Sequence, residues 1–370
     1  MELNRYVPCK DDEIKIHGRT VLDNPLTLFW TGSGIELNAD GSELYIETET
    51  DYSEFEQWIR IEINGFSTIK MPLQKGKSKI CVFHGMSKET IKNVRLIKEV
   101  QPMQRDIHSY LKIHAVESDG RLYPMQDRKY KIEFIGDSIT SGEGLGGTKG
   151  LNEWLPIIFT TYKNYAVQTA EALNADYRII SQSGWGVYSS WDNNITHTLP
   201  KVYPKICSVL DNEVSRRFGS CRDNDFNLWK PDVIVINLGS NDSSAFTSPG
   251  WTDPETGIFY KQRLNDDGKY NEEDVKKFRD AVYNFVAMLR NYNSDSYILW
   301  SYGMIGRGLL PYIEEAVLSY SYEHKDDRVS VQLLPDIKDE WLGANNHPGI
   351  EAHTAAAKTL IERLTEIFNR

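Results

Sequence analysis

The chain has 370 residues, of which 40% are hydrophobic and 26% charged; this composition is typical of a folded globular protein and excludes a largely disordered one. At about 100–200 residues per domain, this length predicts two domains. The 53 acidic and 42 basic side chains give a formal net charge of -11, which argues against binding to nucleic acid or to an anionic membrane because both would repel the chain.

The first residues contain neither the basic nor the apolar region of a secretion signal, and no later run reaches the roughly 18 apolar residues of a membrane span. A cytoplasmic location is therefore expected. The four cysteines, Cys9, Cys81, Cys207 and Cys221, form no CxxC pair, which argues against a zinc cluster or a dense disulfide framework. Buried free thiols are expected, and a Cys207–Cys221 disulfide is the alternative in an oxidising compartment.

The first third of the sequence has the alternating pattern of half-buried strands. Asn64-Gly65 follows one of the alternating runs and favours a hairpin turn, because both residues tolerate a positive φ. Several short strands separated by turn signals predict an all-β jelly-roll sandwich domain over residues 1–127. The alternating runs are 35–39, 44–48, 59–63, 94–96 and 111–113.

The pattern changes after the polar stretch 125–129, which is the predicted junction. Short runs rich in Ile, Val and Leu now alternate with helical patterns, as expected for parallel strands buried on both faces. Apolar residues at helical spacing mark two helices, at 275–289 and 357–368. Residues 128–370 are therefore predicted to form an α/β domain with a three-layer, doubly wound parallel sheet of the flavodoxin-like kind and a site at the carboxyl ends of its strands. The predicted strands are 131–135, 178–181, 232–238, 297–301 and 329–333.

Gly136-Asp137-Ser138 directly follows the predicted strand 131–135. A serine in this position projects from the carboxyl edge of the sheet, and its backbone N–H, near the start of the next helix, can bind a developing oxyanion. Taken alone, the tripeptide is equally compatible with a turn in which Asp137 or Ser138 caps a helix. Its place after a buried strand favours Ser138 as a nucleophile.

Two further strand ends carry groups that suit an oxyanion site. Gly184 follows the strand 178–181 and offers a backbone N–H, while Asn241 follows the strand 232–238 and offers a side-chain amide. Each segment alone is compatible with an ordinary glycine-rich turn. Because three such segments end consecutive strands, we predict that Ser138, Gly184 and Asn241 together form the oxyanion hole.

A serine nucleophile needs a base to accept its proton. His347 lies in the turn 343–349, after the last predicted strand and before the C-terminal helix, on the same edge of the sheet as Ser138. It is the predicted base. His197, after the Gly184 loop, is a candidate for the rim of the pocket, whereas His353 lies inside the helix, where packing is expected.

Together these segments resemble the SGNH, or GDSL, hydrolases, with Ser138, Gly184, Asn241 and His347 matching the serine, glycine, asparagine and histidine of the family's blocks. The stretch HGRTVLDNPLTLFWTGSGIEL ahead of them resembles carbohydrate esterase family 2, so that the resemblance spans nearly the whole chain. That family contains acetylesterases with a jelly-roll domain before the catalytic domain. The resemblance implies removal of acetyl groups from plant manno- or xylo-oligosaccharides, including the 6-position of hexoses, without a metal or an organic cofactor.

One position departs from the superfamily pattern. Many SGNH enzymes carry an aspartate three residues before the histidine, whereas this chain has Ala344. The resemblance to family 2 implies a Ser–His dyad, in which a backbone carbonyl orients the imidazole by accepting its other N–H. Asp336, Asp339 or Glu340 is the alternative third member.

Indole rings stack on the apolar faces of sugars, so tryptophans near the site are candidate substrate contacts. Trp185, Trp341 and Trp300 are the three candidates, although most buried tryptophans serve the core. Two alternative functions stay open: a GDSL hydrolase of lipids or thioesters, and a carbohydrate-binding protein without turnover. The polar loops around Tyr188 and Asn193 favour a short acyl group on a hydroxylated body.

Overall fold

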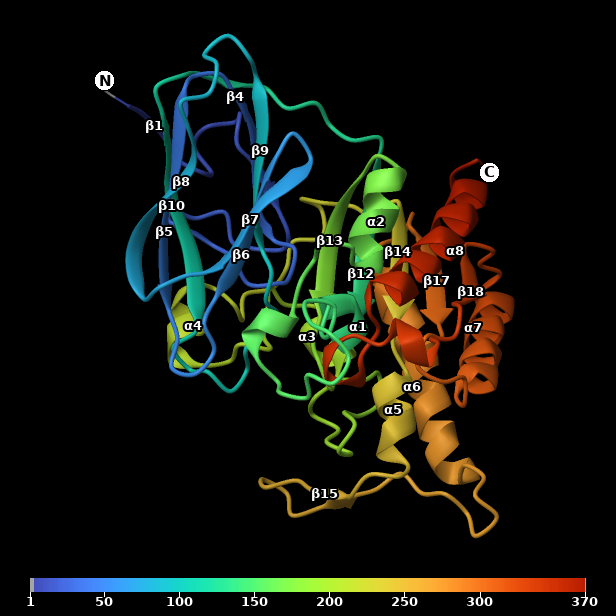
Figure 1. Ribbon diagram of the computed structural model, residues 1–370. Coiled ribbons are helices and arrows are strands. Elements are labelled where there is room, and N and C mark those ends of the chain that lie inside the picture. Colours follow the sequence, from blue (N-terminus) through green and yellow to red (C-terminus); the bar gives the residue numbers. More distant parts are fainter. Residues whose placement is uncertain (1–2, 370) are drawn as a thin grey trace. The chain divides into compact units, whose positions relative to one another are not determined.

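The computed structural model describes residues 3–369. The chain forms two compact units (Figure 1). Unit 1 contains the residues up to 128 together with the segments 153–162 and 205–224, and unit 2 contains the other described residues. Among residues 3–369, no helix has the length and apolar character needed to cross a bilayer.

Unit 1 consists mainly of two antiparallel sheets. The first has the strand order β1-β10-β5-β8, with β3 also paired to β10, and the second has the order β11-β4-β9-β6-β7, with β2 also paired to β4. The strands are β1 (Asn4–Tyr6), β2 (Lys15–His17), β3 (Leu26–Thr27), β4 (Gly34–Ala39), β5 (Glu43–Asp51), β6 (Trp58–Ile63), β7 (Phe66–Pro72), β8 (Gly76–His84), β9 (Lys92–Lys98), β10 (Tyr110–Ser118) and β11 (Leu122–Tyr123).

The alternation that predicted these strands reappears as alternating burial. In β5, Leu44 and Ile46 are buried between less buried neighbours, and they share one hydrophobic cluster with Leu37 and Ile61 of the other sheet. The predicted hairpin turn is confirmed, because Asn64 and Gly65 join β6 to β7 with φ values of 52° and 76°. The two sheets thus enclose a common core, as their sequence pattern indicates.

The segments 153–162 and 205–224 join unit 1 through side-chain bonds to their backbone. They contain η1 (Pro156–Ile158) and α4 (Glu213–Arg217). Lys70 donates from Nζ to the carbonyl oxygens of Ile157 (3.1 Å) and Phe159 (3.0 Å), and Trp30 donates from Nε1 to the Ile206 carbonyl oxygen (2.7 Å). The predicted domains 1–127 and 128–370 place both segments in the second domain, whereas in the structure they pack with unit 1.

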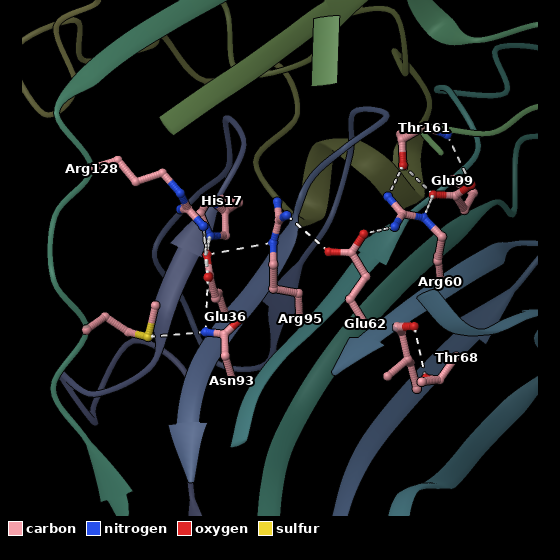
Figure 2. A network of polar contacts seen from close by, with 12 residues as sticks. His17, Glu36, Arg60, Glu62, Thr68, Asn93, Arg95, Glu99, Arg128 and Thr161 are labelled. Atoms are coloured by element: carbon pink, nitrogen blue, oxygen red, sulfur yellow. Dashed lines mark hydrogen bonds and ion pairs between the residues drawn. The ribbon is translucent and has the colours of Figure 1, made fainter. Parts of the chain in front are cut away.

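Buried charged side chains form a network across β4, β9 and β6 of unit 1 (Figure 2). Glu36 lies beside Arg95 (3.7 Å), and Arg95 is paired through Nη1 with Glu62 (3.1 Å). Glu62 also pairs with Arg60, whose Nε lies 3.1 Å from Glu99. Each charge in this apolar setting therefore depends on a partner of opposite sign.

Unit 2 is built on a parallel sheet with the order β13-β12-β14-β17-β18 (Figure 1). All five predicted strands are confirmed: β12 (Tyr130–Gly136), β13 (Ala175–Ser181), β14 (Val233–Asn237), β17 (Tyr297–Tyr302) and β18 (Val329–Leu333). The helices are α1 (Ser138–Ser141), α2 (Tyr165–Ala172), α3 (Leu199–Val202), α5 (Ser240–Ala245), α6 (Glu272–Tyr292), α7 (Leu310–His324) and α8 (Ile350–Phe368). A small hairpin of β15 (Trp251–Thr252) and β16 (Phe259–Tyr260) and the short turns η2 (Asp339–Trp341) and η3 (Ala344–Asn346) complete the unit.

Helices cover both faces of this sheet. Residues of α2 and α8 share one hydrophobic cluster with Phe134 and Leu299, while α6 packs on the opposite face, where its Phe285 meets Trp300 edge to face. The two helices predicted from apolar spacing are α6 and α8. In this doubly wound order the chain reverses its direction of winding between β12 and β14, and ligands bind at such switch points outside the carboxyl ends of the strands.

All four cysteines are free thiols, so the Cys207–Cys221 disulfide does not form in this structure. Cys207 is buried, and burial raises the pKa of its thiol far above the usual value. The expectation of buried thiols holds for Cys207 but not for Cys81, which is exposed.

Candidate active site

Three of the four predicted site residues lie at the carboxyl ends of three adjacent strands. Ser138 begins α1 directly after β12, and Asn241 lies in the first turn of α5 after β14. Gly184 follows β13, on the other side of β12. His347 lies between β18 and α8, and the fold brings it to the same edge although it is 209 residues from Ser138 in sequence.

Ser138 and His347 are in direct contact. Nε2 of His347 lies 2.9 Å from Oγ of Ser138, and Nδ1 lies 2.8 Å from the carbonyl oxygen of Asn345. A carbonyl oxygen can only accept, so Nδ1 carries the proton and Nε2 is free to accept the serine proton. This geometry suits a serine nucleophile paired with a general base.

The backbone carbonyl of Asn345 occupies the place of the missing aspartate. Asn345 and Asn346 both adopt left-handed conformations, with φ values of 52° and 55°, which asparagine tolerates better than most residues. None of the three alternative carboxylates takes this place: Asp336 pairs with Arg307, Asp339 pairs with Lys149, and Glu340 is exposed. The expectation of a carbonyl-oriented imidazole therefore fits the geometry.

Gly184 is required by its local geometry. Its φ of +80° favours glycine, and a Cβ atom there would lie 3.1 Å from Cδ1 of Trp191. Asn241 donates from Nδ2 to the Asp137 carboxylate (3.2 Å) and to the carbonyl oxygen of Trp185 (3.1 Å). Both amide hydrogens thus have acceptors already, and an oxyanion must share or displace one of them.

Asp137 organises the groups around the serine. It is fully buried, caps α1 by accepting from the Ile139 N–H (3.1 Å), and also accepts from the Ser240 hydroxyl and the Asn241 amide. Burial raises the pKa of Asp137 to about 6. The side chain therefore changes charge in the mildly acidic range.

Replacing Asp137 by asparagine is expected to change how stability depends on pH. The pKa of Asp137 rises from 3.8 to about 6 on folding, so the folded protein binds the extra proton between these values. The contribution of this carboxyl group is greatest below pH 3.8 and is lost as the pH rises through about 6. Relative to wild type, the free energy of unfolding of D137N should thus rise by up to about 3 kcal/mol between pH 4 and pH 7, measured by urea unfolding. Asp266→Asn, which removes an exposed carboxyl group, is the control; parallel curves for D137N and wild type would refute the expectation.

Glu143 belongs to the site but had not been predicted from the sequence. Its side chain is buried, and Oε1 lies 3.7 Å from Nε2 of His347. Oε1 accepts from the Asn345 amide (2.8 Å), and Oε2 accepts from the Ser183 hydroxyl (2.6 Å). The available signal was an acidic residue between two glycines, Gly142 and Gly144, just after the serine motif.

The three candidate tryptophans lie in different surroundings. Trp300 is fully buried and donates to the carbonyl oxygen of Leu238 (3.2 Å), so its prediction as a substrate contact is wrong. Trp185 is only 5% exposed and stacks on His197, with ring centroids 4.9 Å apart. Trp341 is half-buried against the α8 core. The sequence reasoning missed Trp191, which is 50% exposed beside Gly184.

His353 has the structural role expected for it. It is fully buried in α8, and its Nδ1 accepts from the backbone N–H of Tyr165 (3.1 Å). Burial lowers the pKa of His353 to about 3, so the ring is neutral at ordinary pH.

Comparison with known proteins adds to this geometry. Residues 132–360 match the family of GDSL-like lipases and acylhydrolases. The solved structure of an acetyl xylan esterase from the rumen bacterium Butyrivibrio proteoclasticus is 40% identical, covers 100% of this chain and 99% of its own, and superimposes with a TM-score of 0.98. The solved structure of a family two carbohydrate esterase from Clostridium thermocellum, in complex with cellohexaose, is 24% identical, covers 96% of this chain and 99% of its own, and has a TM-score of 0.77.

Two curated proteins are also similar. An acetylxylan esterase / glucomannan deacetylase of Cellvibrio japonicus is 22% identical over 100% of this chain and 93% of its own length. The cellulase/esterase CelE of Acetivibrio thermocellus is 26% identical over 92% of this chain, which spans only 37% of that longer protein.

Proposed function

The chain belongs to the family of GDSL-like lipases and acylhydrolases, and from this premise we propose that it is a carbohydrate acetylesterase that removes O-acetyl groups from xylo- and manno-oligosaccharides. The observation that carries the proposal is the 2.9 Å contact between Ser138 Oγ and His347 Nε2, at the switch point of a doubly wound sheet. The similarity to an acetyl xylan esterase over the whole chain supports acetyl as the acyl group that is removed and a xylan-derived sugar as the group that carries it.

In the proposed mechanism, Ser138 attacks the acetyl carbonyl carbon while Nε2 of His347 takes the hydroxyl proton. The backbone N–H groups of Ser138 and Gly184 and the amide of Asn241 bind the oxyanion. His347 then gives its proton to the departing sugar oxygen, which leaves an acetyl group on Ser138. A water molecule, deprotonated by His347, attacks this ester; the bond between the acetyl carbon and Oγ breaks, His347 returns the proton to Oγ of Ser138, and acetate is released.

The surroundings of the oxyanion loop favour a hydroxylated substrate. Trp191, half-exposed beside Gly184, offers an indole face on which a sugar ring can stack. Tyr188 and Asn193, further along the same loop, line a separate pocket of about 370 Å³ whose other lining residues are mostly polar or charged and include none of the catalytic residues. A long acyl chain would require an apolar groove instead.

The two antiparallel sheets of unit 1 and their common core support the further proposal that this unit is a jelly roll. The similarity to a glucomannan deacetylase extends the proposed substrates from xylan-derived to mannan-derived oligosaccharides, and cleavage at the 6-position of hexoses is part of this proposal.

The test is mass spectrometry of acetylated xylo- and manno-oligosaccharides after incubation with the enzyme, with Ser138→Ala as the inactive control. We expect stepwise loss of acetyl groups with an intact sugar chain. Hydrolysis of octanoyl esters in preference to acetyl esters would support the lipase alternative. Calorimetric binding of deacetylated sugar without turnover of any ester would support the carbohydrate-binding alternative.

A further inference from the structure

The catalytic pair lacks the charged partner that usually stabilises the protonated histidine. Once His347 has taken the serine proton, the imidazolium ion faces only a neutral carbonyl oxygen on its Nδ1 side, that of Asn345. In Ser–His–Asp triads a carboxylate stabilises this cation. Here Ala344 stands in the place of that aspartate. A similar stabilisation of the cation therefore requires a negative charge from another side chain.

Glu143 is placed to supply this charge. Its Oε1 lies 3.7 Å from Nε2 of His347, on the side of the ring that faces Ser138. Its two oxygens accept hydrogen bonds from the Asn345 amide and the Ser183 hydroxyl group, which orient the carboxyl group beside the imidazole. Because the side chain is buried, its attraction for a nearby cation is screened less than it would be in water.

The distance also protects the proton that must reach the substrate. At 3.7 Å, Oε1 is too far from Nε2 to form a hydrogen bond, so it can stabilise the cation without capturing the proton meant for the sugar oxygen. The same oxygen holds the Asn345 side chain at 2.8 Å, and Asn345 in turn presents the carbonyl oxygen that fixes the imidazole tautomer.

The loop that follows Glu143 is hydrogen-bonded to the turn that contains His347. Gly144 has a φ of +81°, and a Cβ atom there would lie 2.5 Å from Cβ of His347. The Gly144 carbonyl oxygen accepts from Ala344 (2.9 Å), and that of Leu151 accepts from Asn345 (2.6 Å). Glu143 is thereby held at a fixed distance from the imidazole.

We propose that Glu143 is the positioning residue that replaces the missing aspartate: it stabilises the His347 imidazolium ion by charge and holds Asn345, whose carbonyl orients the ring. This inference rests on the proposed Ser–His function and adds a third participant. Asp137 and His353 are two further ionisable side chains that interact electrostatically with His347. Both stay in place in the variants below, but the charge of Glu143, in addition to burial, raises the pKa of Asp137, so the acid limb is read together with the titration of the His347 ring itself.

The test compares wild type with Glu143→Gln, Glu143→Asp and Glu340→Gln in the hydrolysis of p-nitrophenyl acetate. For E143Q we expect kcat to fall by about 10- to 100-fold, KM to stay nearly constant, and the acid limb of kcat/KM to move to lower pH by about one unit, because the protonated ring loses a neighbouring negative charge. E143D keeps the charge and should recover part of kcat and the wild-type limb. E340Q, which removes an exposed charge ahead of the histidine turn, should behave as wild type.

A second measurement does not depend on the substrate. The titration of the His347 ring is followed by NMR in the S138A background, with and without E143Q, and the midpoint should fall by a similar amount when Glu143 is replaced. An unchanged midpoint, or a loss of kcat without movement of the acid limb, would overturn the proposal and leave Glu143 with a purely structural role. Absence of Ser138-dependent hydrolysis in wild type together with a shifted midpoint would instead overturn the proposed function.

Discussion

Replacing Ser138 by alanine is expected to lower kcat for acetyl ester hydrolysis by roughly 10⁵- to 10⁶-fold, the range seen when the nucleophile of a serine hydrolase is removed. Without Oγ no acetyl-enzyme can form, and His347 has no hydroxyl group to activate. Ser138 is buried and its hydroxyl group contacts His347. Alanine is smaller than serine and fits the same space, so we expect the variant to fold. Steady-state assays with the thermal unfolding midpoint as a check of folding measure both effects.

Two further variants show whether the serine acts together with the histidine. His347→Ala should cost about as much as S138A, and the double variant should be no worse than either, because the two side chains form one functional unit. Losses that multiply in the double variant would contradict this. Ser141→Ala, which removes another hydroxyl group of α1 that donates to Ser181 (2.8 Å), is the matched control and should keep most of the activity.

Replacing Arg60 by methionine is expected to lower the free energy of unfolding of unit 1 by about 3–5 kcal/mol, the cost of breaking a buried ion pair by removing one partner. Arg60 is 1% exposed, and it contacts Glu62, Glu99 and the Thr161 hydroxyl group (2.8 Å). Its loss would leave two carboxylates with too few partners in an apolar setting. Denaturant unfolding, followed by a probe in unit 1, measures the change.

An exposed ion pair in the same unit provides the control. Arg5 pairs with Glu47 and Glu117 at 2.7 Å, but 48% of its side chain is exposed. Arg5→Met should therefore cost less than about 1 kcal/mol. Equal effects of R60M and R5M would show that burial of the network does not contribute to the stability of unit 1.

The elements around the site could be predicted because each has a local signal. The strands of unit 2 are short apolar runs, and the nucleophile, the glycine, the asparagine and the histidine all directly follow such runs or precede a helix. The Asn64-Gly65 turn is likewise encoded by two adjacent residues. In parallel sheets, the carboxyl ends of the strands lie at one edge. These local signals were therefore enough to predict that Ser138 and His347 lie close together.

Other features depend on contacts that no local pattern contains. Glu143 meets Asn345 across 202 residues of sequence, and nothing near either residue indicates the pairing. Trp300 lies in a strand that is buried throughout, so the apolar run could not show that its ring faces α6 rather than the site. The segments 153–162 and 205–224 join unit 1 by long-range bonds to backbone carbonyl groups and to the Thr160 and Thr161 hydroxyl groups, which no local side-chain pattern reveals.

The interrupted course of unit 1 along the chain sets an order for folding during synthesis. When the first 128 residues have left the ribosome, the Trp30 indole still lacks its acceptor at Ile206, and Glu99 still lacks the hydroxyl groups of Thr160 and Thr161. Domains usually fold from the N-terminus as they emerge. Unit 1 is complete only at residue 224, when the segments 129–152 and 163–204 of the second unit have already been translated, so the folding of unit 1 overlaps with the synthesis of the second unit.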